Sequence, residues 1–486
     1  MPLGRLSTPL VEEDETALAP QRAWYPGSPL DMLLECATSS PGKVFVSDTE
    51  GRRLSYYDFF VTATRVAELI RPRGGVVAVA PINSVPGLLA VYAAWLSGRA
   101  VAIIDPLSGP WDLARQLGQV RARLLITHEW FAEQHCGAAA KLGTRCLVAE
   151  KLYEQARAGK TTREYERPRP WDEQLIYFYA GIAGKTLPVI HTGASLASSA
   201  WLTMMHYGYE PEWRVYVPVP ISHGLGLHIG AFSPTASCSS LILYTKKGPL
   251  DPSEAAQSLA SSRASIVFGV PLYYRALLKA GYRGHPGLVY AVSAGAPLST
   301  ELQQEWRRRT GAPLLQMYGM TEALPLIASK PHDPLGSLGK PLPGIETRLT
   351  EEPEGELLAR GPVVMKGYGD PEANKKAFAN GWLRTGDVLR RDEEGYYYFV
   401  RIKKPMLKYK AYPVLLGDLE ELLLSHPDVV GAELGSTDLG DLGEAPVARV
   451  WLRRGSKASG ATIQSWVNEK IAPWKRLYKV TIAGYK

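Results

Sequence analysis

Residues 316–323 spell Gln-Met-Tyr-Gly-Met-Thr-Glu-Ala, which brings an aromatic ring, a hydroxyl and a carboxylate within five positions. An apolar run, Pro313–Leu315, enters the stretch, and a glycine then predicts a turn of the backbone. An aromatic ring can stack on a base, a threonine hydroxyl can bind a phosphate oxygen, and a carboxylate can hold Mg²⁺. Short motifs also match by accident, so a strand-to-loop turn with a polar rim is the alternative.

Length and composition indicate a globular protein with more than one domain. The chain has 486 residues, which is too long for one ordinary domain and enough for a large core. Hydrophobic residues make up 45% and charged residues 21%, which excludes a disordered chain. A formal charge of +7 is small for this length; it is compatible with anionic small ligands and does not predict a nucleic-acid partner.

The cysteines and the apolar stretches predict a cytoplasmic protein without a membrane span. The cysteines at 36, 136, 146 and 238 show no metal-like spacing, which favours free thiols in a reducing compartment over a disulfide framework. Residues 1–20 are acidic and lack the apolar centre of a signal peptide. The uncharged stretches 74–98 and 215–245 are interrupted by Pro, Asn, Ser, Thr or Gly, so we expect core elements rather than membrane helices.

Strand and helix patterns alternate over the first 300 residues or so, which predicts parallel sheets covered by helices. A charged, proline-bearing linker is expected at 157–170, before a strand that leads into a glycine loop. Predicted strands are 43–47, 76–80, 100–105, 124–127, 146–148, 175–179, 265–269 and 287–293. Predicted helices are 28–36, 55–70, 85–96, 195–206 and 271–280.

The pattern changes after Gly344 to short strands and turns, and a basic segment follows at 401–410. Beyond it, helices at 418–425 and 463–471 and strands at 430–434 and 447–453 predict a small α+β unit. We therefore expect a large α/β domain over 1–400 and a small domain over 401–486.

The order of motifs, more than any one of them, resembles the acyl- and aryl-CoA synthetase branch of the adenylate-forming (AMP-binding) superfamily. The resemblance extends from about residue 54 to residue 475. The segments that carry it are Gly75–Ala80, Gly98–Pro106, Ile221–Gly226, Ser293–Ser299, Tyr318–Glu322, Gly336–Gly344, Gly361–Tyr368, Gly381–Asp387 and Ala472–Arg476.

The resemblance implies an ATP-dependent ligase with Mg²⁺ as cofactor, a carboxylic acid as substrate and CoA as co-substrate. Such enzymes join a carboxylate to the α-phosphate of ATP and release pyrophosphate. A free carboxylate would have to expel oxide, whereas its mixed anhydride with AMP expels a good leaving group. The acyl group then passes to CoA, and the small domain swings on a hinge between the two half-reactions.

The same resemblance assigns a nucleotide site. It implies that Asp387 binds both ribose hydroxyls, which suits a carboxylate; an ordinary turn aspartate after a glycine is the alternative. It implies that Thr321 binds the phosphate and Glu322 holds Mg²⁺. The residues that would lie against the adenine are Tyr318, Gly319, Gly295, Ala296 and Pro297.

Other positions carry expected roles in the acyl site and at the hinge. His223 stands where relatives that activate amino acids have an aspartate, so a non-amino acid, fatty or aryl, is the expected substrate; a buried core histidine is the alternative. Arg401 would reach the ribose or phosphate, Lys403 would be the hinge, and Lys408 would contact the nucleotide or the acyl carboxylate. A solvated basic linker is the alternative for these three.

The phosphate-binding loop departs from the family pattern. Gly181 and Gly184 are present, but alanine and isoleucine replace the expected hydroxyls, and Leu187 stands at the expected lysine. Lys185 and Thr186 are the candidate substitutes, because the loop still offers N–H groups and a cation. A Walker A loop is not predicted, since its first glycine would have to be Tyr179.

Further departures keep other functions open. The catalytic Gly-Lys pair expected after Trp474-Lys-Arg is not found before Lys486, one extra residue separates Arg401 from Lys408, and Lys410-Ala-Tyr-Pro replaces Lys-Gly-aromatic-Gln. The first hypothesis is a carboxylate–CoA ligase. The alternatives are a weakened homologue that binds AMP, acyl-AMP or CoA, and an acyl-AMP former that serves another acceptor. The identity of the acid and the oligomeric state are not predicted.

Overall fold

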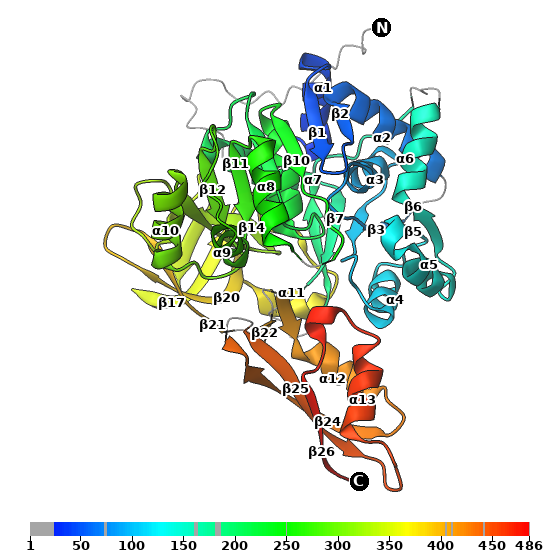
Figure 1. Cartoon of the computed structure of the whole chain (residues 1–486). Coiled ribbons are helices and arrows are strands. Elements are labelled where there is room, and N and C mark those ends of the chain that lie inside the picture. Colours follow the sequence, from blue (N-terminus) through cyan, green and yellow to red (C-terminus); the bar gives the residue numbers. More distant parts are fainter. Residues whose placement is uncertain are drawn as a thin grey trace.

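The structure is a computed structural model, shown in Figure 1, with a large domain above a smaller one that carries the C-terminal end. It describes residues 24–71, 75–159, 164–179, 186–248, 250–403, 406–409, 412–440 and 443–485.

The first sheet of the large domain has helices on both faces. Alternate residues of one central strand point to opposite sides: Val77 and Val79 join the main core, whereas Ala78 and Ala80 join a smaller cluster under α4 and α5. Both faces are therefore buried, which explains the continuous apolar run in the sequence. In sheet order the strands are β18 (Gly367–Tyr368), β8 (Pro188–Thr192), β7 (Glu173–Phe178), β4 (Val101–Ile103), β3 (Val77–Ala80), β5 (Leu124–Thr127) and β6 (Arg145–Val148).

The second sheet follows the same rule. Ile266 and Phe268 face the main core, and Val267 faces the cluster formed with α8, α9 and α10. In order, its strands are β15 (Lys340–Pro341), β14 (Ala323–Ala328), β13 (Leu314–Met320), β12 (Tyr290–Ser293), β11 (Ile266–Gly269), β9 (Arg214–Val217), β10 (Ser240–Leu243), β1 (Val44–Asp48) and β2 (Arg53–Ser55).

A third, antiparallel sheet ends the large domain. Its strands are β16 (Glu346–Leu349), β17 (Glu354–Arg360), β20 (Trp382–Arg391) and β19 (Phe378–Ala379), with β21 (Tyr397–Ile402) paired to β20. The helices of the large domain are α1 (Pro29–Ser39), α2 (Tyr56–Ile70), α3 (Val85–Leu96), α4 (Pro110–Gln119), α5 (Ala132–Ala140), α6 (Ala149–Ala158), α7 (Gly193–Tyr207), α8 (Pro252–Ser262), α9 (Pro271–Lys279), α10 (Thr300–Thr310) and α11 (Pro371–Ala377).

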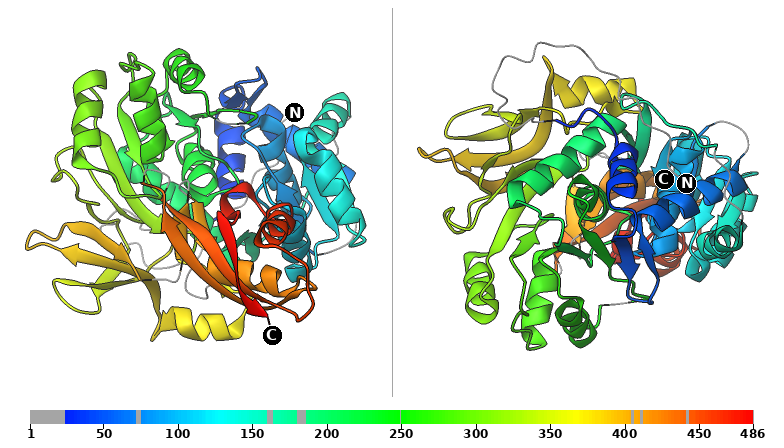
Figure 2. Two further views of the ribbon diagram at one scale, coloured as in Figure 1. Left: turned by 60° about the horizontal axis from the view of Figure 1, so that its bottom comes forward. Right: turned by 90° about the horizontal axis from the view of Figure 1, so that it is seen from above.

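The small domain has its own hydrophobic core, formed between residues 407 and 480. In the left view of Figure 2 it comes forward over the large domain. Its elements are the hairpin β22 (Met406–Tyr409) and β23 (Tyr412–Leu415), the sheet β24 (Val429–Asp438), β25 (Glu444–Leu452) and β26 (Lys479–Tyr485), the helices α12 (Leu416–Leu424) and α13 (Gly460–Asn468), and the short turn η6 (Pro473–Lys475).

The helix starts predicted from the sequence have a physical basis in the structure. Ser28 caps α1 by accepting the N–H of Asp31, whose carboxylate accepts the N–H of Ser28 in return, and Pro29 occupies the first helical position. Ser55 caps α2 in a similar way. Within the described part of the chain, no helix is long and apolar enough to cross a membrane.

Two sequence-based expectations for the sheets need correction. Neither main sheet is purely parallel, because β7 pairs antiparallel with β8 and β13 with β14. The backbone turns at Thr321 and Glu322, and Gly319 lies within strand β13. A glycine is needed there for space, since a Cβ would lie 2.6 Å from Leu324 Cδ1 and 2.9 Å from the Ala323 carbonyl oxygen.

The expectation of free thiols is wrong for this structure. Cys36 is joined to Cys238, and Cys136 to Cys146. The first bond connects α1 to the loop before β10 across 202 positions, and such a pairing cannot be deduced from spacing alone. The second connects α5 to β6.

Thiol titration of the unfolded protein tests these bonds. We expect no reactive thiol before reduction and all four cysteines to react afterwards. A Cys136→Ser, Cys146→Ser variant should still show the Cys36–Cys238 bond. Reactive thiols in the unreduced wild-type protein would contradict the pairing.

Candidate active site

A cavity of about 110 Å³ lies where the two domains meet. Residues from the ends of β4 and β7 and from the hairpin turn at Thr321 form its large-domain wall. The small domain closes the other side. The wall of the large domain includes Asp105, Tyr177, Tyr179, Thr186, His223 and Thr321, and that of the small domain Leu415, Ala472, Trp474 and Lys475.

The expected adenine and ribose residues lie together. Tyr318, on β13, donates its hydroxyl to Asp387 Oδ2 on β20 at 2.8 Å, although 69 positions separate them. Both side chains are buried. Burial, and then the Asp387 carboxylate, raise the pKa of Tyr318 well above its ordinary value, so the hydroxyl remains a donor. An aromatic face and a carboxylate are thus held side by side.

The segment Gly295–Pro297 follows β12, which pairs parallel with β13. Ser293 is the register partner of Gln316, so the segment continues beside the start of the stretch that carries Tyr318. Gly295 has φ +79°, a conformation that favours glycine. Gly295 and Pro297 are exposed and Ala296 is half-buried, so backbone is available to a planar ligand here.

The hairpin turn holds the next pair of expected residues. The Thr321 carbonyl accepts a hydrogen bond from His191 Nε2 at 2.8 Å, and burial lowers the pKa of His191 to about 4, so this imidazole is neutral near pH 7. Glu322 is fully buried and accepts the Tyr368 hydroxyl at 2.6 Å. The backbone N–H of Met365 also binds the Glu322 carbonyl, so the strand β18 region supports the turn.

The turn at Glu322 offers part of the ligand set that Mg²⁺ needs. Glu322 supplies one carboxylate, and in the described ranges no group of three or more His, Cys, Asp or Glu side chains could hold a metal ion. Mg²⁺ is commonly bound by one or two carboxylates together with nucleotide phosphates and water. The donor set therefore suits a metal that arrives with a nucleotide.

His223 lies in the cavity wall rather than in the core, with 40% of its side chain exposed. Its Nε2 is 3.2 Å from Asp105 Oδ2. The residue precedes a π-helical turn, Leu225–Ala231, in which a Cβ on Gly226 would lie 2.1 Å from the Pro220 carbonyl oxygen. This tight fold fixes the backbone that presents His223.

The segment that the sequence assigned to the hinge starts on strand β21. Asp387 is the register partner of Ile402, and the next pair along is Val388 with Arg401, whose side chain is exposed. Lys403 donates its backbone N–H to the Gly386 carbonyl, and its Nζ lies 3.3 Å from the Glu356 carboxylate. Burial opposes ionisation of Glu356, but Arg384 and Lys403 hold its pKa below the usual value.

Some expected residues lie outside the described parts. Gly181, Gly184 and Lys185 fall in 180–185, which the described ranges omit, and the Lys408 side chain is likewise outside them. Thr186 is described, and it contacts the small domain. Its backbone N–H binds Asp418 Oδ1 at 2.8 Å, and its hydroxyl binds Asp418 Oδ2.

A buried ionic cluster joins the domains, and we call it the interdomain clasp. Lys475 Nζ lies 2.8 Å from Asp112 Oδ1 on α4 and 3.2 Å from Asp418 Oδ2 on α12, and Arg115 also pairs with Asp418. Burial lowers the pKa of Lys475, but the two carboxylates outweigh it and raise the pKa above the ordinary value. The Asp112 carboxylate also accepts the backbone N–H of Ala472.

Several of these residues had no assigned role in the sequence. Asp105 and Lys475 stand inside family-like motifs, and that position was the only signal for them. Tyr368 ends another of these motifs, whereas His191, Asp112 and Asp418 carried no signal, because their partners are far away along the chain.

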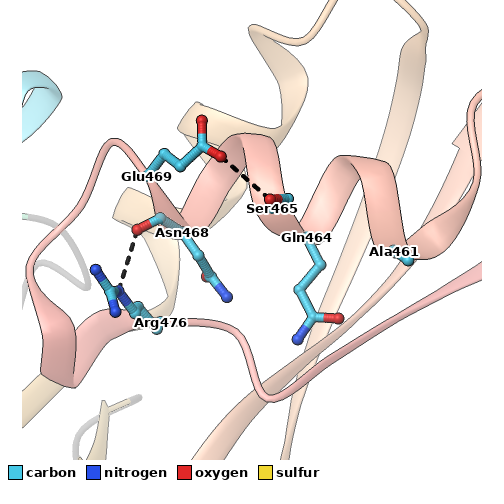
Figure 3. A pocket seen from close by; sticks show the side chains of 6 residues that line it. All are labelled: Ala461, Gln464, Ser465, Asn468, Glu469 and Arg476. Atoms are coloured by element: carbon cyan, nitrogen blue, oxygen red, sulfur yellow. Dashed lines mark hydrogen bonds between the residues drawn. The ribbon is translucent and has the colours of Figure 1, made fainter.

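A second hollow lies on the outer side of the small domain, along α13 (Figure 3). Asn468 uses its amide to bind the backbone of Leu477, Arg476 Nε donates to the Asn468 carbonyl, and Ser465 donates to Glu469. The hydrogen bonds of Asn468 attach α13 to the segment that follows it. None of the expected site residues lines it.

Comparison with known proteins places the chain in a family. The model of the AMP-binding enzyme family matches residues 33–369, and the chain belongs to this family. A probable CoA ligase from Humulus lupulus is 26% identical over 482 residues, covering 91% of this chain and 87% of the relative. A 2-succinylbenzoate–CoA ligase from Bacillus licheniformis is 27% identical over 459 residues, covering 91% and 93%.

A solved structure shares the fold. A double mutant of o-succinylbenzoate CoA synthetase from Bacillus subtilis, bound with its product analogue, superposes with a TM-score of 0.82 at 23% identity. The superposition covers 93% of this chain and 94% of that one. The expected class, a large α/β domain followed by a small C-terminal domain, is therefore confirmed, with mixed rather than parallel sheets. The boundary near residue 400 stays a proposal; β21 ends at Ile402.

Proposed function

We propose that this chain is an ATP-dependent carboxylate–CoA ligase for a non-amino acid, fatty or aryl. The observation that carries the proposal is the Tyr318–Asp387 pair beside the Thr321–Glu322 turn, at the edge of a cavity that the small domain closes. Membership of the AMP-binding enzyme family and CoA-ligase relatives over most of the chain support it. The proposed product is an acyl-CoA, with AMP and pyrophosphate released.

The nucleotide occupies the large-domain side of the site. Tyr318, with Gly319 giving room behind it, lies against the adenine together with the Gly295–Pro297 backbone, and Asp387 accepts both ribose hydroxyls. Thr321 binds the α-phosphate. Arg401 is exposed and directly precedes Ile402, the register partner of Asp387. From the hinge it approaches the ribose or the phosphate. Lys185 and Thr186, with the loop glycines Gly181 and Gly184, take the phosphate chain.

When bound, Mg²⁺ would neutralise charge on the phosphates of ATP. Glu322 is the side chain that would hold it. His191 bonds the backbone carbonyl of Thr321 and Tyr368 bonds the Glu322 carboxylate, so the turn and this carboxylate are both held in place. Lys408 adds a cation from the small domain.

The acid and the thiol meet in the interdomain cavity. His223 and the end of β7 line it from one side, and Trp474 and Leu415 from the other. Position 223 carries a histidine and not a carboxylate, which suits a substrate acid without an amino group. We also propose no nucleic-acid partner and a cytoplasmic location; the location rests on the supply of ATP and CoA there and not on the cysteines, which are disulfide-bonded in the structure.

A specific observation favours a second candidate, a weakened homologue that binds AMP, acyl-AMP or CoA without efficient turnover. The loop 180–183 lacks the expected hydroxyls, and Thr186 is engaged by Asp418 in this domain arrangement. Losing one electrostatic group of this kind typically costs about 10²–10³ in rate. Transfer of the acyl group to an acceptor other than CoA is the third candidate.

Pyrophosphate exchange tests the first candidate. Purified protein with ATP, Mg²⁺ and a panel of fatty and aryl acids is expected to show exchange that depends on the acid and stops when EDTA removes the metal. CoA should then convert the accumulated acyl-AMP to a thioester. Amino acids serve as the matched control and should not support exchange.

The three candidates give different results. Absence of exchange with every acid, together with measurable AMP binding by calorimetry, would overturn the ligase and support the weakened homologue. Exchange without thioester formation would support another acceptor.

A further inference from the structure

Asp105 stands beside His223 in the interdomain cavity, and the sequence assigned it no role. It follows strand β4, and its Oδ1 accepts the backbone N–H of Leu107 at 2.9 Å. Its Oδ2 accepts the Ser222 hydroxyl at 3.4 Å and lies 3.2 Å from His223 Nε2. Only 16% of its side chain is exposed. The carboxylate is therefore anchored from two sides and directed at the imidazole.

Asp105 differs in its partners from Asp112, which also lines the cavity, and from the nearby Asp418. Asp112 and Asp418 are engaged by Lys475 in the interdomain clasp. The other imidazole close to Asp105 is His135, which is fully buried; burial lowers its pKa to about 4, so it is neutral. The charge of Asp105 is thus directed to His223.

His223 shares the interdomain cavity with residues of both domains. Thr321, the expected phosphate ligand, and the small-domain residues Leu415 and Trp474 line the same cavity. In the tautomer whose Nε2–H faces Asp105, Nδ1 is the acceptor nitrogen of a neutral His223. The 3.2 Å contact is not aligned as a hydrogen bond here, as is common for catalytic pairs before ligands bind.

We propose that Asp105 is a positioning residue that holds His223 as the base for the CoA thiol in the second half-reaction. This inference rests on the proposed ligase function. The S–H proton moves to His223 Nδ1, the sulfur forms a bond to the acyl carbon, and the bond from that carbon to the phosphate oxygen of AMP breaks. AMP leaves with the electron pair, and Asp105 balances the charge of the imidazolium.

The test uses the full-length protein and separates the half-reactions. Asp105→Asn keeps the shape and the acceptor for Leu107 but removes the charge. We expect the rate of CoA transfer from preformed acyl-AMP to fall about 10²-fold, near the lower end of what a general base contributes, with the KM for CoA changed less than about threefold. The loss in transfer should exceed any loss in pyrophosphate exchange by about tenfold or more.

A double-mutant cycle decides whether Asp105 acts through His223. His223→Asn alone should lose at least as much transfer rate, and the double variant should be no slower than His223→Asn. Asp172→Asn, at a solvent-exposed Asp–Arg pair far along the chain, is the matched control and should transfer like wild type. Asp105→Ser replaces Asp105→Asn in the cycle if the latter does not fold.

Additive losses, equal losses in both half-reactions, or unchanged transfer by Asp105→Asn would overturn the positioning role while the ligase function stands. A wild-type protein that shows no exchange with any acid would overturn both proposals.

Discussion

Asp387→Ala is expected to weaken AMP binding by about 10²–10³-fold. The carboxylate accepts two ribose hydroxyls in the proposed complex, and hydrogen bonds to a charged group contribute about 1.5–2 kcal/mol each. In the free protein it accepts the Tyr318 hydroxyl, so the substitution also leaves a buried phenol without its acceptor. Isothermal calorimetry with AMP measures the change directly and needs no turnover.

Tyr318→Phe is the matched control for this prediction. It removes the same hydroxyl–carboxylate contact but keeps both the ring and the carboxylate, so we expect less than about a tenfold loss. AMP affinity that is unchanged in Asp387→Ala would refute the ribose role, and equal losses in the two variants would assign the effect to the lost contact instead.

Lys475→Ala is expected to weaken docking of the small domain by about 3–5 kcal/mol, the usual cost of removing one partner from a buried ion pair. Asp112 and Asp418 would then face each other, and only Asp418 would keep a cation, Arg115. Because the clasp keeps the small domain docked over the cavity, CoA-thioester formation should fall more than pyrophosphate exchange.

Hydrogen exchange followed by mass spectrometry measures the docking. In Lys475→Ala, amides of α4 and of the segment 470–477 should exchange faster, since Trp111 and Ala472 donate hydrogen bonds across this interface. Lys479→Ala removes a lysine of the exposed strand β26 and is the control. Protection in Lys475→Ala equal to wild type would contradict the role of the clasp.

Much of the fold could be predicted because it is encoded locally. The α1 start at Ser28-Pro29 and the apolar strand Val77–Ala80 need only their own residues to be identified. The antiparallel strands β8 and β14 were not predicted, because each is a short apolar run next to a segment that was assigned to a family motif. Pairing direction depends on long-range contacts that periodicity does not contain.

The candidate site could likewise be predicted where its motifs are local, but not where its contacts join distant parts of the chain. Tyr318 and Asp387 could be named as site residues because their motifs are local. In the structure the Tyr318 hydroxyl lies 2.8 Å from Asp387 Oδ2. The interdomain clasp could not be predicted: Lys475 and Asp112 are 363 positions apart, and charged residues in surface helices are usually solvated. The disulfide Cys36–Cys238 was missed for the same reason.

The position of β1 has a consequence for how the chain is made. This strand belongs to the second sheet, where Val46 pairs in parallel with Leu241 of β10. A ribosome adds about 5–20 residues per second, so the first strand emerges roughly 10–40 s before the strand that receives it. Until then the apolar side chains of α1 and β1 have no finished sheet to cover them, and newly made chains should depend on chaperones during that interval.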